Sequence, residues 1–314
     1  MGAVTSIAWC HHTFNPWWGC AKVSPGCANC YAEAIDARWG APHWGVKAPR
    51  RFFGDKHWAE PLRWNEAARR AGERRRVFCA SMADVFEDAP GLEEQRKRLW
   101  RLIYDTKNLD WLLLTKRPEN VLRCWNMWAI MGPPSNVWLG TSVEDQERAD
   151  ERIPELLKAP ARVRFLSVEP LLGLVDLMQL EPAGKPIIDC LHGMSGWGCA
   201  ADECGAVDLV IVGGESGPRA RPCDVAWVRA IVAQCRAAGV ACFVKQLGAR
   251  PVQMVPRAKM PVVVQGLLSA CGFEPATDVV REMEVACARI DLRDSKGADP
   301  AEWPEDLRVQ EMPT

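Results

Sequence analysis

Short apolar runs alternate with longer segments of helical periodicity along most of the chain. Each run ends in polar residues, and continuous apolar runs of this length are typical of strands buried on both faces of a parallel sheet. Six runs are clear, at residues 77–80, 109–114, 137–140, 163–166, 208–212 and 241–244. Residues 5–9 and 286–292 are candidates for one further strand near each end of the chain.

Helical patterns fill the intervals between these runs. Leu92, Leu99, Trp100 and Ile103 share one helical face, and a second apolar stripe covers residues 225–235. Asp224 is the expected N-cap of this second helix and Gly239 ends it. Cys235 lies on its apolar stripe and is interpreted as a core residue.

Strands that alternate with helices predict βαβ units. Six to eight such units predict an α/β fold with a complete or partial TIM-type (β/α) barrel. An open doubly wound sheet is the alternative. Residues 181–207 lack a helical period and are expected to form an insertion within a barrel that spans residues 1–249. Residues 250–314 are expected to form a C-terminal extension packed on the barrel.

Composition narrows the class of protein. The chain has 314 residues, 48% of them hydrophobic, and a net charge of −1, so it lacks the overall basic charge of a strong duplex-DNA binder. We find no apolar stretch long enough to cross a membrane and no signal peptide, and we therefore expect a cytoplasmic protein without membrane partners. In that compartment the fourteen cysteines should be thiols or metal ligands rather than disulfides.

Three cysteines near the N-terminus have the spacing of a metal site. Cys20, Cys27 and Cys30 form the pattern C-x6-C-x2-C, with a Pro25-Gly26 turn that can bring Cys20 back towards Cys27. A helix is expected to begin at Tyr31, and its N-terminal dipole favours thiolates. Three cysteines can hold a 4Fe–4S cluster and leave one iron open to a small chelating ligand.

Other chemistry is compatible with the same cysteines. A structural zinc site needs a fourth ligand, which Cys10, His11 or His12 could supply. A redox-active CxxC pair would leave the third cysteine unexplained.

Several blocks of the sequence resemble a known family. They are the segments 5–9, 15–16, 19–33, 114–118, 136–140, 164–173, 210–217, 245–246 and 302–308. They resemble a phage-associated three-cysteine-motif family of unknown function, which is itself similar to radical S-adenosylmethionine (radical SAM) enzymes. The usual radical SAM loop is C-x3-C-x2-C, so the first gap here is longer.

This resemblance implies an enzyme with a 4Fe–4S cluster and S-adenosylmethionine as cofactors. An electron donor would reduce the cluster, adenosylmethionine would be cleaved, and the resulting radical would abstract hydrogen from a polar small-molecule, nucleotide or nucleic-acid substrate. In radical SAM enzymes a Gly-Gly-Glu segment binds adenosylmethionine, and the residues of that type here are Gly213, Gly214, Glu215 and Ser216. The alternatives are a tight structural turn for this loop, and, for the whole chain, a non-enzymatic zinc- or cluster-binding module that serves a phage-encoded partner protein.

Charged and polar residues follow successive strands at the end where barrel enzymes place their chemistry. We interpret Glu169, Lys116 and Lys245 as catalytic candidates, and Asp84, Arg117, Glu144 and Gln246 as substrate contacts. Taken singly, each could be a solvated loop residue. Their recurrence predicts that most of them line one cavity with the three cysteine sulfurs.

The insertion holds a second candidate metal site. Cys190, His192, Cys199 and Cys204 could bind zinc and order an otherwise polar, irregular segment. Their gaps differ from those of common zinc knuckles, and loosely packed thiols are the alternative.

Overall fold

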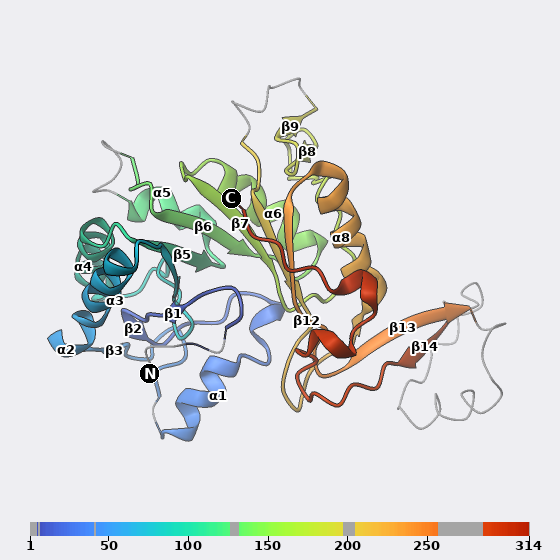
Figure 1. Ribbon diagram of the computed structural model, residues 1–314, viewed down its shortest axis with the longest axis horizontal. Coiled ribbons are helices and arrows are strands. Elements are labelled where there is room, and N and C mark those ends of the chain that lie inside the picture. Colours follow the sequence, from blue (N-terminus) through green and yellow to red (C-terminus); the bar gives the residue numbers. More distant parts are fainter. Residues whose placement is uncertain are drawn as a thin grey trace.

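A sheet of seven parallel strands forms the centre of the molecule (Figure 1). The computed structural model describes residues 5, 7–40, 42–125, 132–196, 205–256 and 285–313. Across the sheet the strands are β1 (His12–Thr13), β4 (Arg75–Cys79), β5 (Leu109–Thr115), β6 (Val137–Ser142), β7 (Val163–Val168), β10 (Leu209–Gly213) and β12 (Ala241–Gln246). All six neighbouring pairs are parallel.

The spatial order of these strands repeats their order along the chain. A doubly wound sheet requires a reversal of that order, so this alternative is wrong. In the described part of the chain the sheet curls into a half-barrel, consistent with a partial TIM-type barrel.

Helices cover the outer face of the half-barrel. The longer ones are α3 (Glu60–Ala71), α4 (Leu92–Asp105), α6 (Gln146–Leu157) and α8 (Val225–Ala238), and α3 packs on β4 and β5, α6 on β6 and α8 on β10 and β12. Shorter helices are α1 (Tyr31–Arg38), α2 (Asp55–Trp58) and α5 (Val121–Cys124).

Local signals explain where α8 begins and ends. The side chain of Asp224 accepts a hydrogen bond from the Ala226 N–H, and Gly239 takes the left-handed conformation that ends the helix. The predicted apolar stripe is buried, Cys235 included. The predicted core face of α4 is buried as well.

The strands bury side chains on both faces, as continuous apolar runs predict. One cluster joins strand residues such as Val77 and Leu113 to helix residues such as Leu99 and Val228. The second contains no residue of the covering helices and therefore lies on the concave face. Its aromatic members are Trp9, Phe78, Trp138, Phe165 and Phe243.

The first strand differs from the sequence expectation. Residues 5 and 7–9, the described part of the expected strand, lie outside any strand; β1 comprises His12 and Thr13, which pair with Val77 and Phe78. Trp9 instead packs edge-to-face on Phe78 in the concave cluster.

The C-terminal residues contact the main sheet and also form a small sheet of their own. β11 (Cys223–Asp224), β13 (Pro251–Pro256) and β14 (Val285–Arg289) make a three-stranded sheet. The candidate strand at 286–292 is thus found as β14, paired with β13 and not with the main sheet. After the short 3-10 turns Pro300–Glu302 and Glu305–Leu307, residues 309–311 run antiparallel to the edge strand β12.

Two further pairs of short strands are antiparallel. β2 (Trp17–Trp18) pairs with β3 (Arg51–Phe52), next to the cysteine motif. β8 (Ile188–Asp189) pairs with β9 (Met194–Ser195) in the insertion. Among the described residues no helix is long and apolar enough to cross a membrane.

Candidate metal centre at the carboxyl ends of the strands

Residues 19–30, here called the cysteine loop, connect the first strand region to α1. The loop leaves the sheet at the carboxyl end of β4, where Gly19 N–H donates to the Met82 carbonyl at 3.0 Å. A 3-10 turn with Pro25 at its first position covers Pro25–Cys27, and Cys30 is the N-cap residue of α1. The three loop thiols are free and half-buried.

Carboxylates at the ends of the strands hold this loop in place. Glu144 follows β6 and has no exposed side-chain surface. Its carboxylate accepts a hydrogen bond from Ser24 Oγ at 2.6 Å and one from Arg152 Nη1 at 2.9 Å. The backbone of Gly26 passes so close that a Cβ there would overlap the Glu144 side chain. The glycine therefore serves the contact between loop and carboxylate.

Glu215 holds the last part of the loop. It accepts hydrogen bonds from Asn29 Nδ2 at 3.0 Å and from Arg221 Nη2 at 2.6 Å, and Arg221 Nη1 donates to the Pro25 carbonyl. Burial alone raises the pKa of Glu215, but the hydrogen bonds from Arg221 and Asn29 outweigh it, and the pKa lies below its ordinary value. Glu215 is therefore ionised at neutral pH.

The glycines before Glu215 are explained by backbone packing. Gly214 N–H donates to the Gln246 carbonyl at 3.0 Å, and a Cβ on Gly214 would overlap the Leu247 carbonyl oxygen. This close approach accounts for Gly214 without a ligand. Ser216, the fourth residue predicted for cofactor binding, is half-buried.

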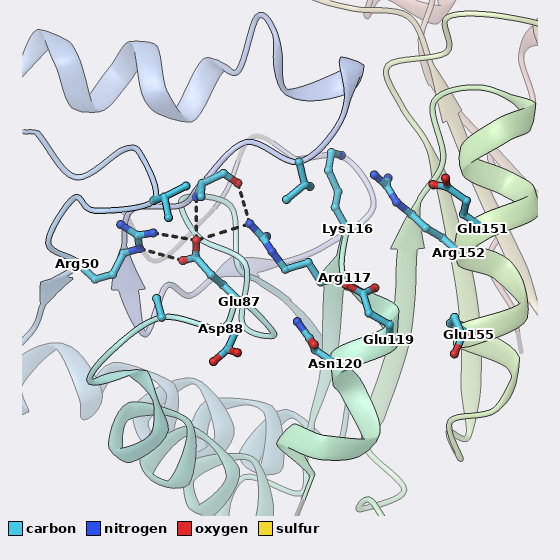
Figure 2. Close-up of a pocket in the computed structure, with 14 residues that line it drawn as sticks. Arg50, Glu87, Asp88, Lys116, Arg117, Glu119, Asn120, Glu151, Arg152 and Glu155 are labelled. Atoms are coloured by element: carbon cyan, nitrogen blue, oxygen red, sulfur yellow. Dashed lines mark hydrogen bonds and ion pairs between the residues drawn. The ribbon is translucent and has the colours of Figure 1, made fainter.

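Glu87 and Arg117 hold the beginning of the loop. Glu87 Oε1 accepts the Ala21 N–H at 2.8 Å, and Arg117 Nη2 donates to the Ala21 carbonyl at 2.7 Å. Figure 2 shows Glu87 between Arg50 and Arg117, with the Arg50 guanidinium in a two-pronged contact with the carboxylate. Asp84 accepts from Arg117 Nη1 at 2.8 Å and from Thr115 Oγ1 at 2.7 Å.

The Cys20 thiol lies close to Asp84, Glu87 and Arg117. Burial and the nearby Asp84 raise the pKa of Cys20 to about 12, although Arg117 acts in the opposite direction. Burial also raises the pKa of Cys30, and Cys27 is close enough to add to that effect. Metal binding at these sulfurs would therefore release protons.

A second group of polar residues lies at the ends of β7 and β12. Lys245 Nζ donates to both carboxylate oxygens of Glu169, at 2.7 and 2.8 Å, and Gln246 Nε2 donates to Glu169 at 2.9 Å. Lys245 lies near the carboxyl end of β12, where the pairing of this strand with β10 becomes irregular. Lys116 directly follows the last residue of β5.

The predicted strand-end residues, together with Glu215, divide into two sets, and Gln246 is buried and donates to Glu169 of the second set. Asp84, Arg117, Glu144 and Glu215 are buried and contact the cysteine loop directly or through one another. Lys116, Glu169 and Lys245 keep 20%, 18% and 28% of their side chains exposed, which leaves them accessible at the mouth of the half-barrel. Sequence reasoning missed Arg50, Glu87, Arg152 and Arg221, which hold the loop directly or through its carboxylate partners, because no spacing rule connects them to it.

A pocket of about 400 Å³ opens beside the cysteine loop (Figure 2). Ala21 and Val23 of the loop form one side, and Lys116, Asn120 and Glu151 are among the residues around it. None of the three loop cysteines lines this pocket. The pocket therefore lies beside the cysteine loop and is not lined by its thiols.

The donor set of the loop fits a metal cluster in its chemistry. It offers three free thiols on one loop, at the end of the sheet where barrel proteins place their sites. In the residues that the structure describes, no three His, Cys, Asp or Glu side chains are already gathered as a metal site.

The candidate zinc site in the insertion is described only in part. Cys190 is buried and its Sγ donates to the Leu177 carbonyl at 3.1 Å, while His192 Nδ1 lies 2.8 Å from the Asp189 carboxylate. Cys199 and Cys204 lie outside the described residues. The predicted zinc site remains a prediction.

The fold and the loop define an α/β half-barrel protein with three cysteines at the carboxyl ends of its strands. The family model that matches this chain covers residues 4–268 and is described as Protein of unknown function (DUF5131). The chain belongs to this family. Comparisons with curated proteins and with solved structures gave no match.

Proposed function

We propose that the chain is a radical SAM-like iron–sulfur enzyme acting on a polar substrate of nucleotide or nucleic-acid type. The observation that carries the proposal is the placement of the cysteine loop. The loop that carries the three cysteines follows the first strand and precedes α1, and Glu87, Glu144 and Glu215 accept hydrogen bonds from its residues Ala21, Ser24 and Asn29. A reactive centre must keep a fixed position relative to its substrate. A loop held by several hydrogen bonds at the mouth of a half-barrel meets this requirement.

Cys20, Cys27 and Cys30 would hold a 4Fe–4S cluster. When bound, such a cluster supplies an electron for cleavage of S-adenosylmethionine and leaves one iron open to chelate that cofactor. The long first gap of the motif is compatible with this role because Ser24 and Gly26, within the gap, contact Glu144 and fold the loop back.

The accessible side chains at the mouth would bind the substrate. Lys116 and Lys245 supply positive charge for phosphate or carboxylate groups, and Lys245 Nζ can donate to a substrate oxygen while Glu169 orients it. Gln246 Nε2 also donates to the Glu169 carboxylate. We assign Asp84, Arg117, Glu144 and Glu215 to support of the loop, and Glu169, Lys116 and Lys245 to the substrate.

The metal content of the protein tests the proposal. The chain should be isolated anaerobically, its iron and zinc counted, and its visible spectrum recorded. We expect a brown, oxygen-sensitive protein that forms 5′-deoxyadenosine from S-adenosylmethionine when a reductant is added. A colourless protein that contains zinc and leaves S-adenosylmethionine intact would contradict the proposal and favour a metal-binding module that serves a phage-encoded partner.

A further inference from the structure

Four charged side chains form a buried network beneath Cys20. Arg117 is 8% exposed, and its partners Asp84 and Glu87 are 5% and 3% exposed. Arg50 closes the network from the far side, with Nε and Nη2 each 2.8 Å from the Glu87 carboxylate. Two cations thus neutralise two anions within one buried cluster.

Stability alone is a weak explanation for such a network. Burying an ion pair carries a large desolvation cost, and apolar residues packed in its place often give a fold of equal or greater stability. Arg50 and Asp84 bind backbone groups outside the cysteine loop, whereas Glu87 and Arg117 also reach two consecutive residues of that loop. Ala21 has both its N–H and its carbonyl bound, by Glu87 and Arg117, and Arg117 Nη1 reaches Cys20 Sγ at 3.7 Å.

Arg117 is the member that contacts the sulfur. Its Nη1 contacts both Asp84 and Cys20, and its Nη2 contacts Ala21 and lies 3.6 Å from Glu87. A planar fork with five donors can satisfy these acceptors together, whereas the point charge of a lysine cannot. Asp84 is in turn held by Thr115 Oγ1 and by the Lys116 N–H, so the guanidinium has a fixed support.

We propose that Arg117 is a positioning residue that donates a hydrogen bond to the Cys20 sulfur and thereby sets the reduction potential of the cluster bound there. The proposal rests on the proposed function. A donor to a ligating sulfur stabilises the more negative, reduced state of a cluster, and its loss makes reduction harder. Lys116, one residue earlier, faces the mouth and does not contact the sulfur.

The test compares Arg117→Gln and Arg117→Lys with the unaltered protein after anaerobic reconstitution. Arg164→Gln is the matched control, because Arg164 is a partly buried arginine at the amino end of β7 whose guanidinium donates to the Ala159 carbonyl. Iron per chain and the midpoint potential, from a titration followed by electron paramagnetic resonance, are measured for each protein.

We expect Arg117→Gln to shift the midpoint to a more negative potential, Arg117→Lys to shift it in the same direction by less, and Arg164→Gln to leave it unchanged. Selective loss of iron from both Arg117 variants, with normal iron in Arg164→Gln, would also support the positioning role. Equal potentials and equal iron in all four proteins would overturn the role of Arg117 and leave the proposed function standing. Absence of iron from the unaltered protein would overturn both.

Discussion

Single residues show how closely the cysteine loop is fitted to the sheet. Gly26 lies against the buried Glu144 carboxylate, which leaves no room for a Cβ. We expect Gly26→Ala to lower the free energy of unfolding by about 1–3 kcal/mol, the usual cost of overpacking, and to reduce iron loading. Gly173→Ala is the control, since an added Cβ meets nothing within 4 Å there. Chemical denaturation of both variants measures the difference, and equal stabilities would contradict the fit described.

Glu215 makes a pH-dependent contribution to stability. Because its folded pKa is lowered, its contribution is complete above the unfolded glutamate pKa of about 4.3 and is lost as the pH falls through the folded pKa. Glu215→Gln should therefore cost on the order of 1–3 kcal/mol at pH 7 and less as the pH falls below about 4. The exposed Glu66→Gln should change stability little at either pH, because ion pairs in water contribute little. A Glu215→Gln deficit that is the same at pH 7 and pH 3 would refute this account.

At this scale the sequence predicted the positions of the strand-end residues but not their partners. Lys116 and Lys245 could be placed because they follow apolar runs, and the carboxyl ends of the strands of a (β/α) barrel lie on one face. Arg221 and Glu87 could not, because they reach the loop through turns whose course depends on tertiary contacts. Asn29 lies within the cysteine motif itself, yet its partner Glu215 is 186 residues away.

Elements were predictable to the extent that their signals are local. The helix α8 has a periodic stripe, an N-cap and a terminal glycine, and all three are found as expected. The strand β1 has two residues, too few to show periodicity, and exists because His12 and Thr13 pair with β4. The pairing of β14 with β13 was likewise beyond sequence reasoning, since strand partners are chosen over long distances.

The edge strand β12 gives a prediction about an element. Glu311 N–H donates to the Cys242 carbonyl at 2.8 Å, so the C-terminal residues cover an otherwise open edge. Glu311→Pro removes that donor and should cost about 1 kcal/mol, the usual net value of one hydrogen bond, with faster hydrogen exchange along β12. Glu311→Ala keeps the N–H and is expected to cost less. If both variants exchange β12 amides at the same rate, the C-terminal segment does not protect this edge.

In the whole molecule, the cysteine loop, the buried charges that hold it and the accessible charged side chains all lie at the carboxyl ends of the half-barrel's strands. The outer helices and the concave aromatic cluster stabilise the sheet, and the strand ends carry the polar residues. The net charge of the chain is only −1, yet several buried ion pairs gather at the carboxyl ends of the strands, because these pairs hold the cysteine loop there. We propose that at this end the three loop cysteines bind one iron–sulfur cluster.

The most direct test is the iron content of the unaltered protein and of Cys20→Ala, Cys27→Ala, Cys30→Ala and Cys235→Ala, each reconstituted anaerobically. Cys235 is a buried thiol on α8 and serves as the matched control. We expect each of the three loop variants to lose most of its iron, while Cys235→Ala keeps as much as the unaltered protein. Full cluster content in Cys27→Ala would contradict the account.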